Sequence, residues 1–174
     1  MKSVDRGRVA AWIAAYERHL PPGEGPTAEP AAGDITPDLL VGFPRSGTTM
    51  LEQALAAHPE VGTSGERPIV QRLKRTLGRL ADDPEAFAGR IAAMGPAELT
   101  SLRRQLFRIA REEVPGPHRR ILHKHPMDVI ELPLLERLVP EARVLHVVRD
   151  PRDVFLSCLK QRFVPNMVNV HFLA

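Results

Sequence analysis

The sequence has little of several things, and each shortage removes a class of function. Cys158 is the only cysteine among 174 residues, so neither an internal disulfide nor a CxxC-type metal site can form. No apolar run is long enough to cross a bilayer. The net charge is only +3, and no basic stretch is interleaved with aromatic residues. The sequence therefore predicts a cytoplasmic protein that binds neither membrane nor nucleic acid.

The length suits one α/β domain with a substantial core. Apolar residues at three- and four-residue steps predict a helix over residues 3–20, and the stretch rich in Pro, Gly and Ala at 21–37 predicts a linker. We therefore expect an N-terminal helix (1–20), a linker (21–37) and a main domain (38–174). The chain starts directly on a helix that carries Arg and Glu, unlike a signal peptide. Its Ala, Arg and Pro bias is typical of a GC-rich bacterial genome.

Strand-like and helix-like segments alternate along the main domain. Apolar runs predict buried strands at 38–42, 121–124 and 143–148, with a short extended stretch from Val61. Helical spacing occupies 48–57, 69–80, 84–94, 96–114, 127–139 and 151–163, with Pro133 disturbing the fifth of these helices. This alternation predicts an α/β fold of P-loop type, a mostly parallel sheet flanked by helices.

The segment Gly42-Phe43-Pro44-Arg45-Ser46-Gly47-Thr48-Thr49 lies between the first predicted strand and a helix. Glycines let the backbone approach an oxyanion closely, and the N–H groups from Ser46 to Met50 would point into the loop. The helix N-terminus adds partial positive charge, and two threonine hydroxyls add donors. The pattern predicts a phosphate-binding loop, with a glycine turn that binds nothing as the alternative.

The loop departs from that of nucleotide triphosphatases. Thr48 stands where those proteins carry lysine, and the basic residue, Arg45, lies inside the loop. No strand followed by an Asp that could hold Mg²⁺ stands out. These departures argue against ATP or GTP hydrolysis, and they leave a P-loop phosphotransferase or kinase as a weaker alternative.

A second polar cluster follows the predicted strand at 143–148. Arg149 begins a charged turn, and Ser157 lies about two helical turns further on. Ligands of open parallel sheets bind beyond the carboxyl ends of the strands, so this pair could hold a second phosphate beside the loop. The alternative is an ordinary helix start, capped by Asp150 and flanked by Arg–Asp surface pairs.

Together the two clusters resemble the sulfotransferases that use 3′-phosphoadenosine 5′-phosphosulfate (PAPS). Residues 44–49 resemble the family's 5′-phosphosulfate loop, and 148–154 with Ser157 resemble its 3′-phosphate site. The arginine in the loop, followed by His58-Pro59-Glu60-Val61 and by Gly65-Glu66, is closest to the tyrosylprotein sulfotransferase branch and its bacterial relatives. Some of those relatives carry TPR repeats before the transferase, and the helix over 3–20 would be the end of such an array.

The resemblance implies transfer of a sulfuryl group from PAPS to an acceptor hydroxyl, without a metal. It covers roughly residues 38–163. It also assigns the donor site: the 5′-phosphosulfate would be bound by Arg45, Ser46, Gly47, Thr48, Thr49 and Met50, and the 3′-phosphate by Arg149 and Ser157.

The resemblance further proposes catalytic groups. Glu66 matches the branch's glutamate base, with Arg45 expected to keep it ionised, and its alternative is a helix-start carboxylate paired with Arg67. Lys124 matches a lysine placed near the sulfuryl group. His123 and His125 are rival bases, with ordinary strand-end hydrogen bonding as their alternative. The branch has an arginine two residues after its glutamate, where this chain has Pro68. That departure leaves the acceptor open among peptide tyrosine, sugar, lipid and small metabolite.

Domains of this family run beyond the position of residue 174. We therefore expect an incomplete sulfotransferase domain with some apolar surface exposed, and the activity of this chain alone is left open. A non-catalytic, truncated nucleotide-binding module is the third alternative. The sequence also leaves open whether the protein is a homo-oligomer.

Overall fold

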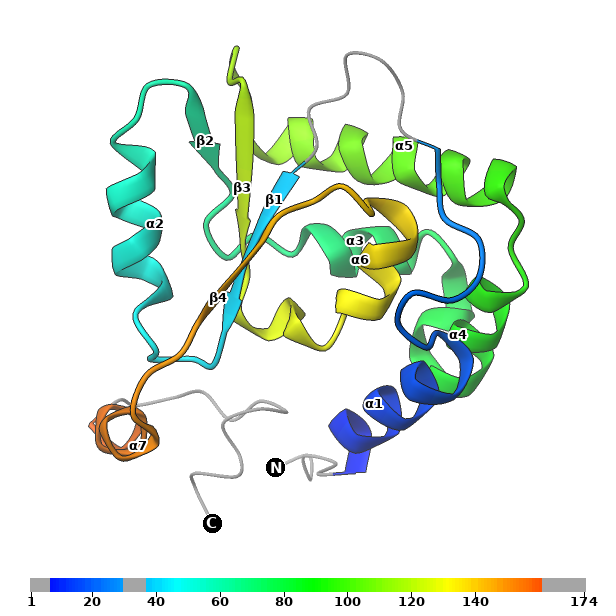
Figure 1. Cartoon of the computed structure of the whole chain (residues 1–174), viewed down its shortest axis with the longest axis horizontal. Coiled ribbons are helices and arrows are strands. Elements are labelled where there is room, and N and C mark those ends of the chain that lie inside the picture. The colour runs from blue at the N-terminus through cyan, green and yellow to red at the C-terminus, as the bar shows by residue number, and fades with distance from the viewer. Residues whose placement is uncertain (1–6, 30–36, 161–174) are drawn as a thin grey trace.

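The computed structural model describes residues 7–29 and 37–160 (Figure 1). Four strands form one sheet in the order β2-β3-β1-β4, and every pairing is parallel. The strands are β1 Pro37–Gly42, β2 Val61–Thr63, β3 Arg120–Lys124 and β4 Val144–Val147. The predicted α/β fold with a parallel sheet flanked by helices is confirmed, and β1, which leads into the glycine loop, lies inside the sheet.

The helices largely match the predicted ranges. They are α1 Gly7–His19, α2 Thr48–Ala56, α3 Ile69–Arg75, α4 Pro84–Ala92, α5 Pro96–Glu113, α6 Leu132–Leu138 and α7 Pro151–Leu159, with two 3₁₀ turns, η1 Gly78–Asp82 and η2 Pro126–Val129. The helix expected over 69–80 ends at Arg75, and Gly78, with a left-handed φ of +64°, begins the separate 3₁₀ turn η1. The helix expected over 127–139 is divided, and Pro133 stands in the first turn of α6, where a missing N–H is tolerated.

The register of the sheet assigns its two faces. Leu39 of β1 pairs with His123 of β3, and Leu40 pairs with Lys124. Because side chains alternate along a strand, His123 and Lys124 project from opposite faces. Leu39 belongs to the main hydrophobic core, which α1, α3, α4, α5 and α6 complete, while α2 packs on the sheet as a separate layer. The histidine is therefore on the core side and the lysine on the α2 side.

Helix α1 packs into the same core as the sheet domain. The Trp12 ring lies 5.4 Å from that of Phe87 in α4, and the ammonium of Lys74 sits 3.3 Å above the Trp12 ring. Tyr16 donates a 2.5 Å hydrogen bond to Glu131, which also binds Lys74 at 2.8 Å. The predicted boundaries at residues 20 and 37 and a preceding repeat array stay predictions.

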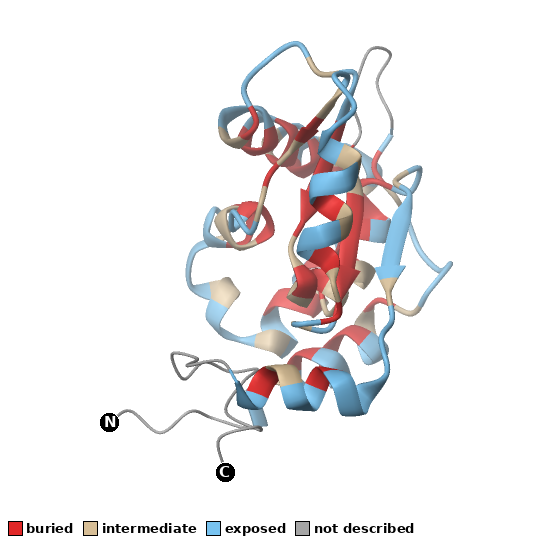
Figure 2. Cartoon of the chain, turned by 90° about the vertical axis from the view of Figure 1, so that its left-hand side faces the viewer, coloured by how far each residue is buried: buried red, intermediate tan, exposed pale blue. Residues whose placement is uncertain are grey.

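The expectation of a buried strand at 143–148 is wrong. β4 forms, but Val144 is 47% and Leu145 39% exposed, and Val148 just after it is 79% exposed. Figure 2 shows β4 exposed beside the buried β1 and β3. The physical reason is position: β4 is an edge strand, and no other strand of the described residues pairs with its outer side. Apolar composition alone cannot tell an edge strand from a central one.

Candidate active site

The loop between β1 and α2 has the backbone of an anion-binding turn. Gly47 takes a φ of +107°, which glycine adopts at little cost. At Gly42, an added Cβ would lie 2.7 Å from the carbonyl oxygen of Val147, so the close pairing of β1 with β4 at this position requires glycine. Arg45 also has a positive φ, +71°, although it carries a side chain. Strained residues of this kind cluster at functional sites.

The start of α2 offers polar groups to a ligand. Gly47 precedes the helix and has no side chain to cap it, so the amide groups of Thr48, Thr49 and Met50 have no side-chain acceptor. The Oγ atom of Ser46 is buried and has no hydrogen-bond partner in the described part of the chain. Such an orphaned hydroxyl beside free helix amides suits a bound oxyanion. Met50 is 75% exposed, so the group of this residue that could contact a ligand in the loop is its backbone amide.

The structure brings the second cluster to the loop. Arg45 Nε donates to Ser157 Oγ at 3.0 Å, across 112 residues of sequence. Arg149 Nη1 donates a long, 3.4 Å hydrogen bond to the carbonyl oxygen of Arg45. Asp150 caps α7 by accepting from the Arg152 amide at 2.9 Å, as the alternative interpretation expected. The two interpretations of this cluster are compatible. Asp150 caps α7, while Arg149 and Ser157 contact Arg45 of the loop.

Lys124 links the loop to the predicted base. Its ammonium lies 2.9 Å from Glu66 Oε1, 3.4 Å from Thr49 Oγ1 and 3.4 Å from Glu52 Oε2. The lysine side chain is 4% exposed, whereas that of Glu66 is 62% exposed. The expectation that Arg45 would be the charge partner of Glu66 is therefore corrected to Lys124. Glu66 keeps a solvent-accessible carboxylate that an incoming hydroxyl can reach.

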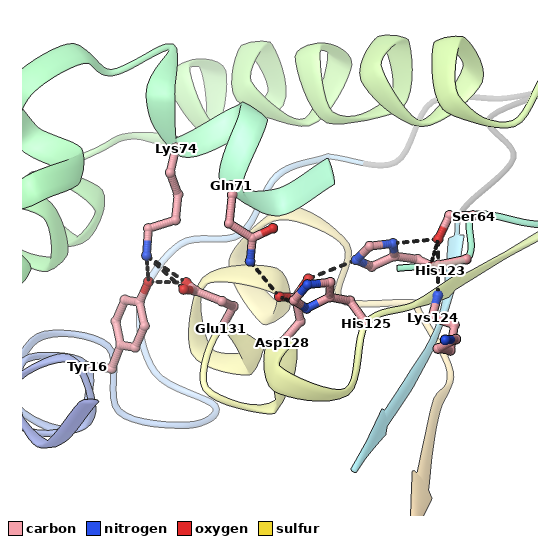
Figure 3. Close-up of polar contacts among 10 residues, drawn as sticks. Tyr16, Ser64, Gln71, Lys74, His123, Lys124, His125, Asp128 and Glu131 are labelled. Carbon is pink, nitrogen blue, oxygen red and sulfur yellow. Dashed lines mark hydrogen bonds and ion pairs between the residues drawn. The ribbon is translucent and has the colours of Figure 1, made fainter. Parts of the chain in front are cut away.

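The two rival histidines face away from Lys124 (Figure 3). His123 contacts Ser64 Oγ at 3.0 Å and donates to Asp128 Oδ2 at 2.8 Å. His125 Nδ1 lies 2.8 Å from Asp128 Oδ1, an ion pair without hydrogen-bond alignment. Burial opposes charge on His125, but the contacts with Asp128 and the charge of Glu66 outweigh it and raise its pKa. The His123 ring makes the structural hydrogen bonds expected as its alternative, whereas the His125 ring makes an ion pair.

Sequence reasoning missed two buried polar residues at this site. Glu52 of α2 accepts from the Gly65 amide at 3.0 Å with one oxygen and faces Lys124 with the other. Ser64, directly before the Gly-Glu pair, accepts from the backbone amide of Lys124 at 3.2 Å. Glu52 could have been found, because it lies one helical turn after Thr48 and so shares its face of α2. Ser64 gives no such signal.

Residues 7–29 and 37–160 contain no group of three or more His, Cys, Asp or Glu side chains placed to hold a metal ion. No helix within these ranges is long and apolar enough to cross a membrane.

A parallel sheet with a glycine loop between an inner strand and an uncapped helix places the protein among the α/β proteins of P-loop type. The model of the sulfotransferase family matches residues 37–171, and the chain belongs to that family.

The chain is also similar to individual proteins, and two of those described below bear the name of a sulfotransferase. An uncharacterized protein of Aquifex aeolicus is 32% identical over 132 residues, which cover 73% of this chain and 17% of that protein. Protein-tyrosine sulfotransferase 1 of Homo sapiens is 31% identical over 129 residues, 71% of this chain and 34% of the human protein. A putative protein-tyrosine sulfotransferase of Caenorhabditis briggsae is 26% identical over 121 residues, which cover 70% of this chain and 42% of that protein. The chain thus spans less than half the length of these relatives.

Proposed function

We propose that this protein binds PAPS and transfers its sulfuryl group to an acceptor hydroxyl. The observation that carries the proposal is the contact between Arg45 and Ser157, because it unites the phosphosulfate loop with the residues assigned to the 3′-phosphate. A ligand that carries phosphate groups on both the 3′ and the 5′ oxygens of its ribose needs two such anchors. A nucleoside triphosphate, whose phosphates form one chain, does not.

The donor site has the groups that such a ligand requires. The α2 amides and the unpartnered Ser46 hydroxyl would bind the 5′-phosphosulfate, with the guanidinium of Arg45 at the mouth of the loop. Arg149 and Ser157 would bind the 3′-phosphate. Arginine suits both places, because its planar fork matches phosphate and sulfate oxygens.

Transfer would need a base and a group that stabilises the leaving oxygen. Glu66 would take the proton of the acceptor hydroxyl while the new bond forms between the acceptor oxygen and sulfur. The bond between sulfur and the bridging oxygen breaks, and adenosine 3′,5′-bisphosphate leaves. Lys124, between Thr49 and Glu66, and Arg45 would stabilise the charge that develops on the oxygens. The protein's contribution is positioning and electrostatics.

The names of the relatives suggest peptide tyrosine as one acceptor. Against it, Pro68 occupies the position of an arginine in that branch, and neighbouring Arg67 pairs with Glu113 at 2.9 Å. We therefore propose an acceptor hydroxyl, with a tyrosine peptide as the first acceptor to assay.

Calorimetric titration with adenosine 3′,5′-bisphosphate tests the donor site. We expect binding without Mg²⁺, and about 10-fold or greater weakening in Arg149→Ala, because a hydrogen bond to a charged group is lost. Arg152→Ala is the matched control, since the ion pair of that arginine within the described residues is with Asp150 on the surface. Mg²⁺-dependent ATP binding with no bisphosphate affinity would instead identify a phosphotransferase. Bisphosphate binding with no transfer from PAPS to any hydroxyl acceptor would identify a binding module.

A further inference from the structure

A buried chain of polar side chains lies behind Lys124, and the proposed reaction does not use it (Figure 3). Ser64 Oγ lies 3.0 Å from His123 Nδ1, and His123 Nε2 lies 2.8 Å from Asp128. The order serine, histidine, aspartate is that of a hydrolytic triad. A nucleophile must meet its substrate, however, and Ser64 is only 2% exposed. The chain of contacts needs another explanation.

Ser64 joins the two segments that carry Glu66 and Lys124. Its hydroxyl oxygen lies 3.0 Å from the carbonyl oxygen of Gly65, directly before Glu66, and accepts from the Lys124 amide at 3.2 Å. Its own amide donates to the carbonyl oxygen of Leu122 at 3.0 Å. One residue therefore fixes the turn after β2 against the end of β3. The same two segments carry Glu66 and Lys124, whose side chains form an ion pair of 2.9 Å.

Asp128 holds the other end of the chain. Its buried carboxylate accepts from His123 and from Gln71 Nε2, each at 2.8 Å, and forms an ion pair with His125. Burial by itself raises the pKa of Asp128, but the two histidines outweigh it and hold the pKa below its usual range. The carboxylate stays ionised and fixes the His123 ring. The ring in turn presents its second nitrogen to Ser64.

We propose that Ser64, held through His123 by Asp128, is a positioning residue for sulfuryl transfer. It sets the placement of Glu66 and Lys124 and touches neither substrate. The inference rests on the proposed function, which assigns those two side chains to the reaction. Removing the hydroxyl leaves the Lys124 amide and His123 Nδ1 buried without their partner, and it frees the turn that carries Glu66.

Kinetics of the full chain with PAPS and a hydroxyl acceptor give the first test. In Ser64→Ala we expect kcat to fall about 10- to 100-fold, the cost of a misplaced reacting group, with the KM for PAPS unchanged. Ser64→Cys, which keeps a weak donor and acceptor, should recover part of the loss. Tyr16→Phe is the matched control, because it removes one buried hydroxyl from the Lys74–Glu131 network and should leave kcat unchanged. Wild-type kcat in Ser64→Ala overturns the inference.

The lysine ammonium signals give a test that does not require activity. The chain has four lysines, Lys2, Lys74, Lys124 and Lys160, so a ¹H–¹⁵N spectrum of ammonium groups is simple to assign. We expect the Lys124 signal to be protected in the wild type and lost in Ser64→Ala, while that of Lys74, paired with Glu131, persists. If Ser64→Ala does not fold, Ser64→Cys replaces it, with a smaller change expected.

The two tests separate the inference from the function on which it rests. A wild type without bisphosphate binding or transfer, but with a Lys124 signal that depends on Ser64, refutes the proposed function and leaves the positioning geometry intact. An active wild type in which Ser64→Ala changes neither kcat nor the Lys124 signal refutes the positioning role alone.

Discussion

The two edges of this sheet, called the β2–β3 side and the β4–α7 side below, hold their parts of the site in different ways. On the β2–β3 side, Lys124 is 4% exposed, and buried bonds from Glu52 and Ser64 fix its surroundings. On the β4–α7 side, Arg149 and Ser157 reach the loop through exposed hydrogen bonds of 3.4 and 3.0 Å. Apolar side chains around them face solvent, among them Val148 at 79%, Leu159 at 57% and Leu156 at 54%.

The difference shows that one part of the candidate site is held in place by buried contacts and the other part by exposed ones. Lys124, one of the groups proposed for sulfuryl transfer, lies in a buried polar network, whose low dielectric surroundings strengthen each contact. The groups proposed for the 3′-phosphate depend on surface contacts that solvent and salt weaken. We therefore expect substitutions on the first side to change stability and chemistry together, and those on the second side to change ligand binding alone.

The largest effect should come from the carboxylate that anchors the buried network. Asp128→Ala removes the partner of His123, His125 and Gln71, and we expect a loss of about 3–5 kcal/mol in the free energy of unfolding. Asp153→Ala, on the exposed side, breaks only a 3.6 Å surface pair with Arg149 and should cost about 0–1 kcal/mol.

Urea unfolding followed by circular dichroism measures both variants. Equal losses would show that the two sides do not differ in the way the contacts indicate.

Next in size is a substitution at the strained arginine of the loop. Arg45→Gly should raise the free energy of unfolding by about 1 kcal/mol, because glycine tolerates the φ of +71°. The same change should weaken bisphosphate binding about 10- to 100-fold, since the guanidinium and its bond to Ser157 are lost. Arg45→Ala is the control that loses the side chain but keeps the strain. A gain in stability from Arg45→Ala as large as that from Arg45→Gly would rule out the backbone explanation.

Local sequence patterns predicted the strands and the loop because their causes are local. One short segment of the chain contains the whole pattern: an apolar run that ends at Gly42, then Gly47, then a helix. The burial of β4 was predicted wrongly, since burial depends on which elements cover a strand. The spacing of Glu52 from Thr48 could have shown which helix face it shares, but the partners of Glu52 and Ser64 lie far away in sequence and could not be predicted from spacing. Arg45 was assigned to Glu66 on charge alone, whereas the fold gives that place to Lys124.

A smaller effect concerns the pH dependence of stability. The contacts of His125 with Asp128 and the charge of Glu66 raise its pKa above 6.5 against the effect of burial, and nearby Lys124 opposes the rise. A raised pKa in the folded state means that this contribution is fully present below about pH 6.5 and is lost as the pH rises through the folded value. We expect the unfolding free energy of wild type minus that of His125→Gln to fall between pH 6 and 8.

Denaturant titrations at several pH values measure this difference. A difference that stays constant over the range, or grows with pH, would contradict the ion pair between His125 and Asp128.

The smallest effect is expected at the apolar side chains of the exposed edge. Val148→Thr changes a residue that is 79% exposed, so it should alter the free energy of unfolding by no more than about 0.5 kcal/mol. Leu40→Ala, in the neighbouring strand at 0% exposure, should cost about 2–5 kcal/mol. Thermal and urea unfolding give the free energy of unfolding of each variant. The expected difference tests whether the hydrophobic core ends between β1 and β4. If Val148→Thr lowered the free energy of unfolding about as much as Leu40→Ala, the β4 edge would have to be covered in solution. The contrast between the two edges of the sheet would then come from a contact absent from this structure.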